Sequence, residues 1–135
     1  MYAVDGKTEL VLPPNLYIIG TMNTADRSVG QIDYAIRRRF AFVDVEPKDL
    51  SAELGNKFHK LLFDAVAALF DTYRSAEFEK KDVQLGHSYF IDKSGEGGSM
   101  AIRLQYEIKP ILREYVKDGI LIGEEIKAVI DKLSV

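Results

Sequence analysis

An amide and a group of arginines are the side chains in this sequence best suited to phosphate chemistry. Asn23 stands three residues beyond residues 16–20, a continuous apolar run typical of a strand covered on both faces. In an open α/β sheet, ligands bind just beyond the carboxyl ends of the strands. An amide placed there can donate to a phosphate oxygen while it accepts from a water molecule. The alternative is an asparagine that forms an Asx-turn with its own backbone.

The arginines are consecutive: Arg37, Arg38 and Arg39. Successive helical residues are rotated by about 100°, so these side chains fan apart and at most one or two of them can reach a phosphate. They join a predicted helix to a predicted buried strand, where guanidinium groups removed from water need anions as partners. The alternative assigns them to the negative C-terminus of the helix, with Arg37 paired to Asp33 one turn earlier.

The elements expected around these side chains form a strand–turn–helix–strand unit. Residues 2–12 read as two short extended runs around Asp5 and Gly6, which suit a tight β-hairpin turn. Residues 16–20 are expected to be a buried strand of the parallel type. Ser28 stands three residues before Gln31, the spacing of a capping box, and predicts a helix that runs to about Arg38. Residues 40–45 form a further apolar strand that ends before Pro47.

Helical patterns dominate after Pro47. From Leu54 to Tyr73, apolar residues recur at helical spacing and predict one amphipathic helix, on a face formed by Phe58, Leu61, Leu62, Ala65 and Leu69. Residues 93–99 contain three glycines and predict a flexible loop. The sequence therefore predicts an α+β fold that is mainly α, with an α/β piece at residues 1–47 and an all-helical piece at residues 48–135.

The end of the chain predicts two further helical segments. Pro110 interrupts a helical pattern, and because proline lacks an N–H and clashes with the preceding turn, we expect a kink or a new helix start there. Asp118 and Gly119 are a plausible stop. The last amphipathic helix is expected on the face formed by Ile126, Val129, Ile130 and Leu133.

Composition excludes several classes of function. The chain has 135 residues, no cysteine and two histidines, so disulfides, thiolate zinc sites and cysteine nucleophiles are excluded and no metal site is expected. The net charge of −3 provides no general attraction for nucleic acid. No apolar run approaches a membrane span and no signal peptide is recognisable, so no membrane contact is expected and a cytoplasmic location is the default.

Two segments of the first third resemble the McrB family of AAA+ proteins, the GTP-hydrolysing subunits of methylcytosine-dependent restriction systems. They are residues 20–28 (GTMNTADRS) and residues 33–40 (DYAIRRRF). Residues 85–90 (LGHSYF) and 106–112 (YEIKPIL) resemble two further family blocks in the helical lid. The resemblance implies that the α/β piece is the remnant of an AAA+ sheet with a β-hairpin, followed by a helical lid subdomain.

The resemblance also implies roles for individual residues. Asn23 would be the sensor of the AAA+ site, Asp26 the acid of the family's N-T-A-D motif, and Arg38 and Arg39 the arginines that reach a neighbouring subunit's nucleotide. Further nucleotide contacts would come from Thr24, Arg27, Arg37 and Arg103.

Several of these residues have an ordinary structural alternative. Asp26 could cap the following helix, and Arg27 could be a solvated loop residue. Arg103 and Arg113 are both candidates for a lid arginine that touches the γ-phosphate, with surface salt bridging as the alternative. His87 is expected in a packed turn of the lid, because no acid at a suitable spacing accompanies it.

Two parts of a complete motor of this class are absent from the sequence: a glycine-rich loop ending in Gly-Lys-Ser/Thr and an acidic strand end that holds magnesium. The sequence therefore predicts a piece of a longer enzyme that binds no cofactor and is inactive by itself. In the intact protein, GTP or ATP with Mg²⁺ is expected as cofactor. The resemblance implies a homo-oligomeric ring, expected to be a hexamer, a McrC-like nuclease subunit as partner, and DNA contacts through other domains.

Two other classes of function remain open at this point. The chain could belong to a related AAA+ ATPase that remodels protein complexes. It could instead be a non-catalytic module that only occupies a place in a ring.

Overall fold

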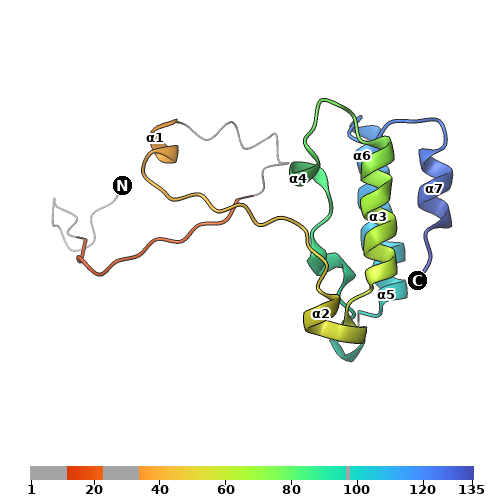
Figure 1. Ribbon diagram of the computed structural model, residues 1–135, viewed down its shortest axis with the longest axis horizontal. Helices are drawn as coiled ribbons and strands as arrows, with labels where there is room; N and C mark the ends of the chain where they lie inside the picture. Colours follow the sequence, from red (N-terminus) through yellow and green to blue (C-terminus); the bar gives the residue numbers. More distant parts are fainter. Residues whose placement is uncertain (1–11, 23–33, 97) are drawn as a thin grey trace, which may run out of the picture.

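The computed structural model describes residues 12–22, 34–96 and 98–135. A body of packed helices occupies the C-terminal two-thirds, and an extended arm leads away from it toward the N-terminus (Figure 1). The described residues of the arm include a short helix, α1 (Tyr34–Arg37). The predicted β-hairpin at residues 2–12 lies outside the described residues.

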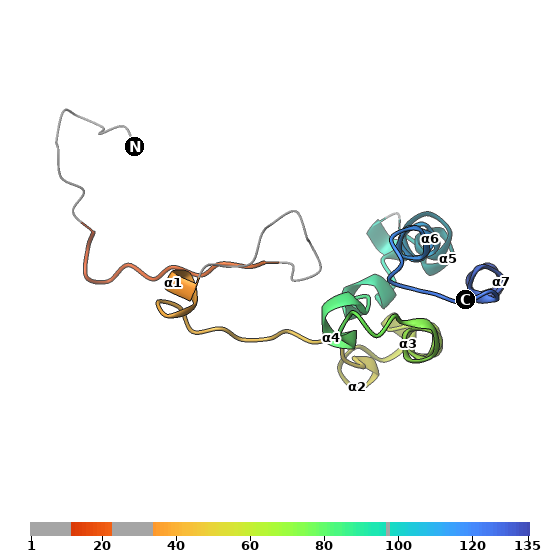
Figure 2. The same cartoon turned by 90° about the horizontal axis from the view of Figure 1, so that it is seen from above.

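The helical body begins with α2 (Ser51–Leu54), the 3₁₀ turn η2 (Gly55–Lys57) and the long helix α3 (Lys60–Tyr73). Then follow α4 (Lys80–Val83) and two 3₁₀ turns, η3 (His87–Phe90) and η4 (Ser94–Glu96). The chain ends with α5 (Met100–Arg103), the π-helix η5 (Leu104–Ile108), α6 (Lys109–Lys117) and α7 (Ile126–Lys132). Helices α3, α6 and α7 lie side by side (Figures 1 and 2).

Helix α3 begins later than its apolar pattern predicts. The prediction of one helix from Leu54 is wrong, because Gly55 adopts a positive φ of 55° after α2 and Phe58 is extended. Phe58 forms an isolated antiparallel bridge with Ile91, and the helix starts two residues later at Lys60. Leu61, which we expected on the apolar face, is 85% exposed, whereas Leu62, Val66 and Leu69 are buried.

The predictions for the last two helices are confirmed. Pro110 lies in the first turn of α6, directly after the π-helix, where the hydrogen-bonding pattern changes from π to α. The π-helix before it ends with the Lys109 N–H donating to the Leu104 carbonyl oxygen. Helix α6 ends at Lys117, directly before Asp118 and Gly119, and Gly119 has the positive φ of 71° that suits a helix stop. Helix α7 buries Ile126 and Ile130.

One hydrophobic core holds the body together, and its buried members all lie between Phe58 and Ile130. Phe70, Ile108, Leu112, Leu121 and Ile130 are fully buried within it. Phe63 packs its ring edge-on against Phe90, with ring centres 5.3 Å apart, and Phe70 meets Tyr115 in the same way at 6.1 Å. The 3₁₀ turn η3 and helix α6 are thereby attached to α3.

The apolar segments of the arm are exposed, whereas the sequence predicted that they would be buried. Residues 16–20 were expected to be buried, but Tyr17, Ile18 and Ile19 are 87%, 65% and 93% exposed. Val43 and Val45, in the second predicted strand, are 83% and 82% exposed. The expected burial is therefore wrong, because no other layer within the described ranges covers either segment. Strand pairing among the described residues is limited to three isolated bridges, and the AAA+ sheet stays a prediction.

Candidate functional site

The arginine cluster lies at the end of α1 in the exposed arm (Figure 1). Arg37 is the last residue of the helix, and the Arg39 N–H closes the following turn by donating to the Ile36 carbonyl oxygen at 2.9 Å. The Arg37 guanidinium carbon stands 5.8 Å from the centre of the Phe42 ring, a cation–π arrangement. The Arg37 side chain is therefore held by a residue of the same segment.

Arg38 and Arg39 are exposed, and neither makes an ion pair within the part of the chain that the structure describes. The predicted pairing of Arg37 with Asp33 involves a residue outside the described ranges. Two guanidinium groups are thus presented to solvent beside a third that is held by an aromatic ring. This arrangement leaves Arg38 and Arg39 available to an anionic group from another molecule.

The other predicted residues of the phosphate site lie outside the described residues: Asn23, Thr24, Asp26 and Arg27. Their roles stay predictions. Met22, the last described residue before them, is 48% exposed.

Arg103 lies in the helical body and apart from the arginine cluster (Figure 1). Its side chain is 9% exposed, and all its nitrogens donate to partners in the same body. Nη1 donates to the carbonyl oxygens of Ser88 and Ile91 at 3.0 and 2.8 Å. Nε and Nη2 donate to Glu107 Oε2 at 3.0 and 2.9 Å. Arg103 therefore joins η3 to the π-helix, and the surface position considered for it is wrong.

Arg113, the other lid candidate, is half-exposed and pairs with Asp131 Oδ1 at 2.8 Å. The surface salt bridge considered for it is therefore confirmed. Lys109 reinforces the same junction, since its buried side chain donates to the Asp131 carbonyl oxygen at 2.9 Å. A cation beside the last carbonyls of α7 also complements the helix dipole. Two basic residues of α6, Lys109 and Arg113, thus hold α7 in place.

His87 lies at the start of η3, in a packed turn of the body as predicted. Its Nδ1 is buried and has no hydrogen-bond partner among the residues that the structure describes. Within the described ranges, no group of three or more histidine, cysteine, aspartate or glutamate side chains is placed to hold a metal ion. None of the helices in those ranges has the length and apolarity needed to cross a membrane.

A set of ion pairs at the start of α3 was not expected from the sequence. Lys60 Nζ lies 2.8 Å from both Asp49 Oδ2 and Asp64 Oδ2. The hydrogen bond from Lys60, together with those from Ser51, lowers the pKa of Asp49 to about 2. The Asp49 and Asp64 carboxylates raise the pKa of Lys60 to about 12. The Lys60–Asp49 pair connects the segment before α2 to α3, a link that only the fold creates, whereas the Lys60–Asp64 pair lies within α3.

Comparison with curated proteins finds the "Type IV methyl-directed restriction enzyme EcoKMcrB subunit" of Escherichia coli (strain K12). It is 33% identical to this chain in an alignment 132 residues long, and the alignment covers 87% of this chain. The chain spans 29% of that relative's length. No protein-family model and no solved structure matches the chain. The chain is therefore McrB-like across most of its own length.

Proposed function

We propose that this chain is the nucleotide-sensing and trans-arginine part of a McrB-like AAA+ nucleotide hydrolase that drives DNA restriction. The similarity to a McrB subunit over 87% of the chain carries the proposal. The exposed Arg38 and Arg39, without ion-pair partners among the described residues, support a role outside their own chain. A McrC-like nuclease subunit is the proposed partner, and DNA is bound through other domains.

In the proposed mechanism, two groups of this chain act at two different nucleotides. Asn23 binds a γ-phosphate oxygen and orients the attacking water, using both the donor and the acceptor of its amide. Arg38 or Arg39 approaches the nucleotide of a neighbouring copy and stabilises the negative charge that develops during phosphoryl transfer. Asp26, Thr24 and Arg27 organise the loop around Asn23. A segment with a Gly-Lys-Ser/Thr loop supplies the phosphate cradle, and GTP with Mg²⁺ is the proposed substrate complex.

The proposed sheet explains why the arm is apolar. Residues 16–20 and 40–45 would be strands that pair with the strands of the phosphate-binding segment, which would cover side chains such as Ile19 and Val43. An apolar strand with unpaired backbone groups is stable in water only when another strand or layer covers it. The exposed arm is thus an element that needs a partner.

The test is hydrolysis by the assembly that contains both this chain and a Gly-Lys-Ser/Thr loop. Asn23→Ala and the double variant Arg38→Ala/Arg39→Ala should each lower the GTP turnover number by on the order of 10²-fold or more. Lys117→Ala is the matched control, because this exposed cation of α6 lies outside the proposed site and should leave the rate unchanged. Unchanged turnover in both test variants would favour a non-catalytic ring module. Hydrolysis of ATP in preference to GTP would favour a remodelling ATPase.

A further inference from the structure

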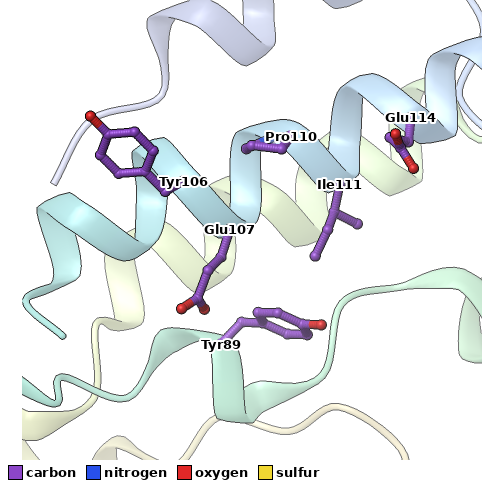
Figure 3. Close-up of a pocket in the computed structure, with 6 residues that line it drawn as sticks. All are labelled: Tyr89, Tyr106, Glu107, Pro110, Ile111 and Glu114. Carbon is purple, nitrogen blue, oxygen red and sulfur yellow. The ribbon is translucent and has the colours of Figure 1, made fainter. Parts of the chain in front are cut away.

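A groove runs along the outer side of the π-helix and α6, in the helical body (Figure 3). Its volume is about 460 Å³, and it is lined by Tyr89, Tyr106, Glu107, Pro110, Ile111 and Glu114. Five of the six come from one helical face, while Tyr89 comes from η3 on the opposite side. Glu107 and Ile111 point toward Tyr89, whereas Tyr106 stands at the rim (Figure 3). The groove is therefore apolar and aromatic along its walls and acidic at two places.

Its two carboxylates are not equivalent. Glu107 uses Oε2 to accept from Arg103, and its side chain is still 47% exposed. Glu114 is exposed and makes no ion pair with any residue that the structure describes. A site with carboxylates beside the face of a tyrosine ring suits a flat cation, because guanidinium groups stack on aromatic rings and bind carboxylates through paired hydrogen bonds. Such a groove is suited to an arginine side chain.

The chain itself carries exposed arginines of this kind. Arg38 and Arg39 have no ion pair within the described ranges, whereas Arg37 is held over Phe42. When one of the two serves a phosphate, the other is left for a second anionic site. Both views place α1 in the arm, away from the body that holds α6 (Figures 1 and 2). The groove of a second copy is thus the better-placed partner.

We infer that the groove between η3 and α6 binds Arg38 or Arg39 of a second copy of this chain. Glu114 supplies the unpaired charge, Glu107 adds its remaining carboxylate capacity, and Tyr89 offers a ring face for stacking. The contact rests on the proposed ring assembly. It identifies the groove between η3 and α6 as the surface that meets the arginines after α1 of the neighbouring copy. It requires no nucleotide, so it can be tested separately from the proposed hydrolysis.

Site-directed disulfide formation tests the contact directly, because the natural chain contains no cysteine. One chain carries Arg39→Cys and a differently tagged chain carries Glu114→Cys, and the two are mixed under oxidising conditions without nucleotide. The heterodimer should form at least about fivefold faster than with Glu77→Cys, an exposed acid outside the groove, as the matched control. Equal rates for the two pairs would overturn the inference. The inference would also be overturned if a chain that carries both Arg39→Cys and Glu114→Cys formed only the intramolecular disulfide.

A charge reversal provides the second test. Glu114→Lys should weaken self-association by about tenfold or more, because a like charge then faces the arginines. Glu77→Lys should have no effect on self-association. Mixing Glu114→Lys with Arg38→Glu/Arg39→Glu should restore association between the two variants, as measured by sedimentation. Failure of that rescue would overturn the contact, and so would undiminished self-association of Arg38→Ala/Arg39→Ala. Loss of hydrolysis in a variant that still associates concerns the proposed nucleotide role.

Discussion

Arg103 illustrates how a single cation can become part of a protein core. A buried guanidinium is costly unless its donors are satisfied, and here two backbone carbonyl oxygens and one carboxylate accept from it. The carbonyls belong to the segment at η3 and the carboxylate to the π-helix. Two separate segments of the body are therefore connected by one side chain, and four of the five N–H donors of Arg103 are used within the body.

Arg103→Ala should lower the free energy of unfolding by about 3 kcal/mol, since it leaves the Ser88 and Ile91 carbonyls without this donor and opens a cavity. Arg113→Ala is the matched control, because its exposed pair with Asp131 should contribute less than about 1 kcal/mol. Urea unfolding of both variants measures the difference. Equal effects would mean that the Arg103 network does not stabilise the body.

The turns between helices decide how the helices meet. After α6, the backbone bridge between Arg74 and Leu121 and the hydrogen bond from the Ile122 N–H to the Tyr73 carbonyl oxygen join the end of α3 to the link before α7. Gly123 follows directly, with a φ of 143°. A Cβ at this position would stand 2.8 Å from Tyr73 Cδ1. Only glycine allows this link to pass so close to the tyrosine ring.

Gly123→Ala should therefore destabilise the body by about 2 kcal/mol, through both backbone strain and the contact with Tyr73. Gly95→Ala serves as the control, because a Cβ there meets no atom within 4 Å and the residue has no positive φ. The midpoint of urea denaturation should fall for the first variant and stay nearly constant for the second. A midpoint that is unaltered in Gly123→Ala would show that the link relaxes without cost.

The molecule as a whole consists of a packed body and an arm that makes few contacts with it (Figure 1). All members of the hydrophobic core belong to the body, together with the apolar residues packed around it, which begin at Leu50. Lys81 and Asp44 form an ion pair across the junction at 3.9 Å, and both side chains are largely exposed. The energetics of the body should thus be almost independent of the arm.

A chain restricted to residues 48–135 should unfold cooperatively, with a free energy of unfolding within about 1 kcal/mol of that of the full chain. Removal of residues 118–135 from this shorter chain is the comparison, because it deletes the fully buried Leu121 and Ile130 and should abolish the cooperative transition. Circular dichroism during thermal unfolding measures both. A non-cooperative transition for residues 48–135 would mean that the arm completes the core.

The parts that could be predicted from the sequence depend on neighbouring residues only. Apolar spacing located α7, the missing N–H of Pro110 located the start of α6, and Asp118 and Gly119 located its end. The motif resemblance agrees with the McrB-like relationship found by comparison. These features could be anticipated because helix periodicity, helix termination and motif spacing are local properties of a chain.

The tertiary structure decided which side chains are buried and which meet. Leu61 has the spacing of a core residue yet faces solvent, because the turn at Gly55 and the bridge at Phe58 set the start and orientation of α3. Ile19 belongs to a strand-like run yet is exposed, since burial requires a second layer that its own segment cannot provide. Arg103 and the acidic groove depend on residues from separate elements. Local spacing determines which conformations a segment favours, whereas burial and pairing depend on which other segments fold against it.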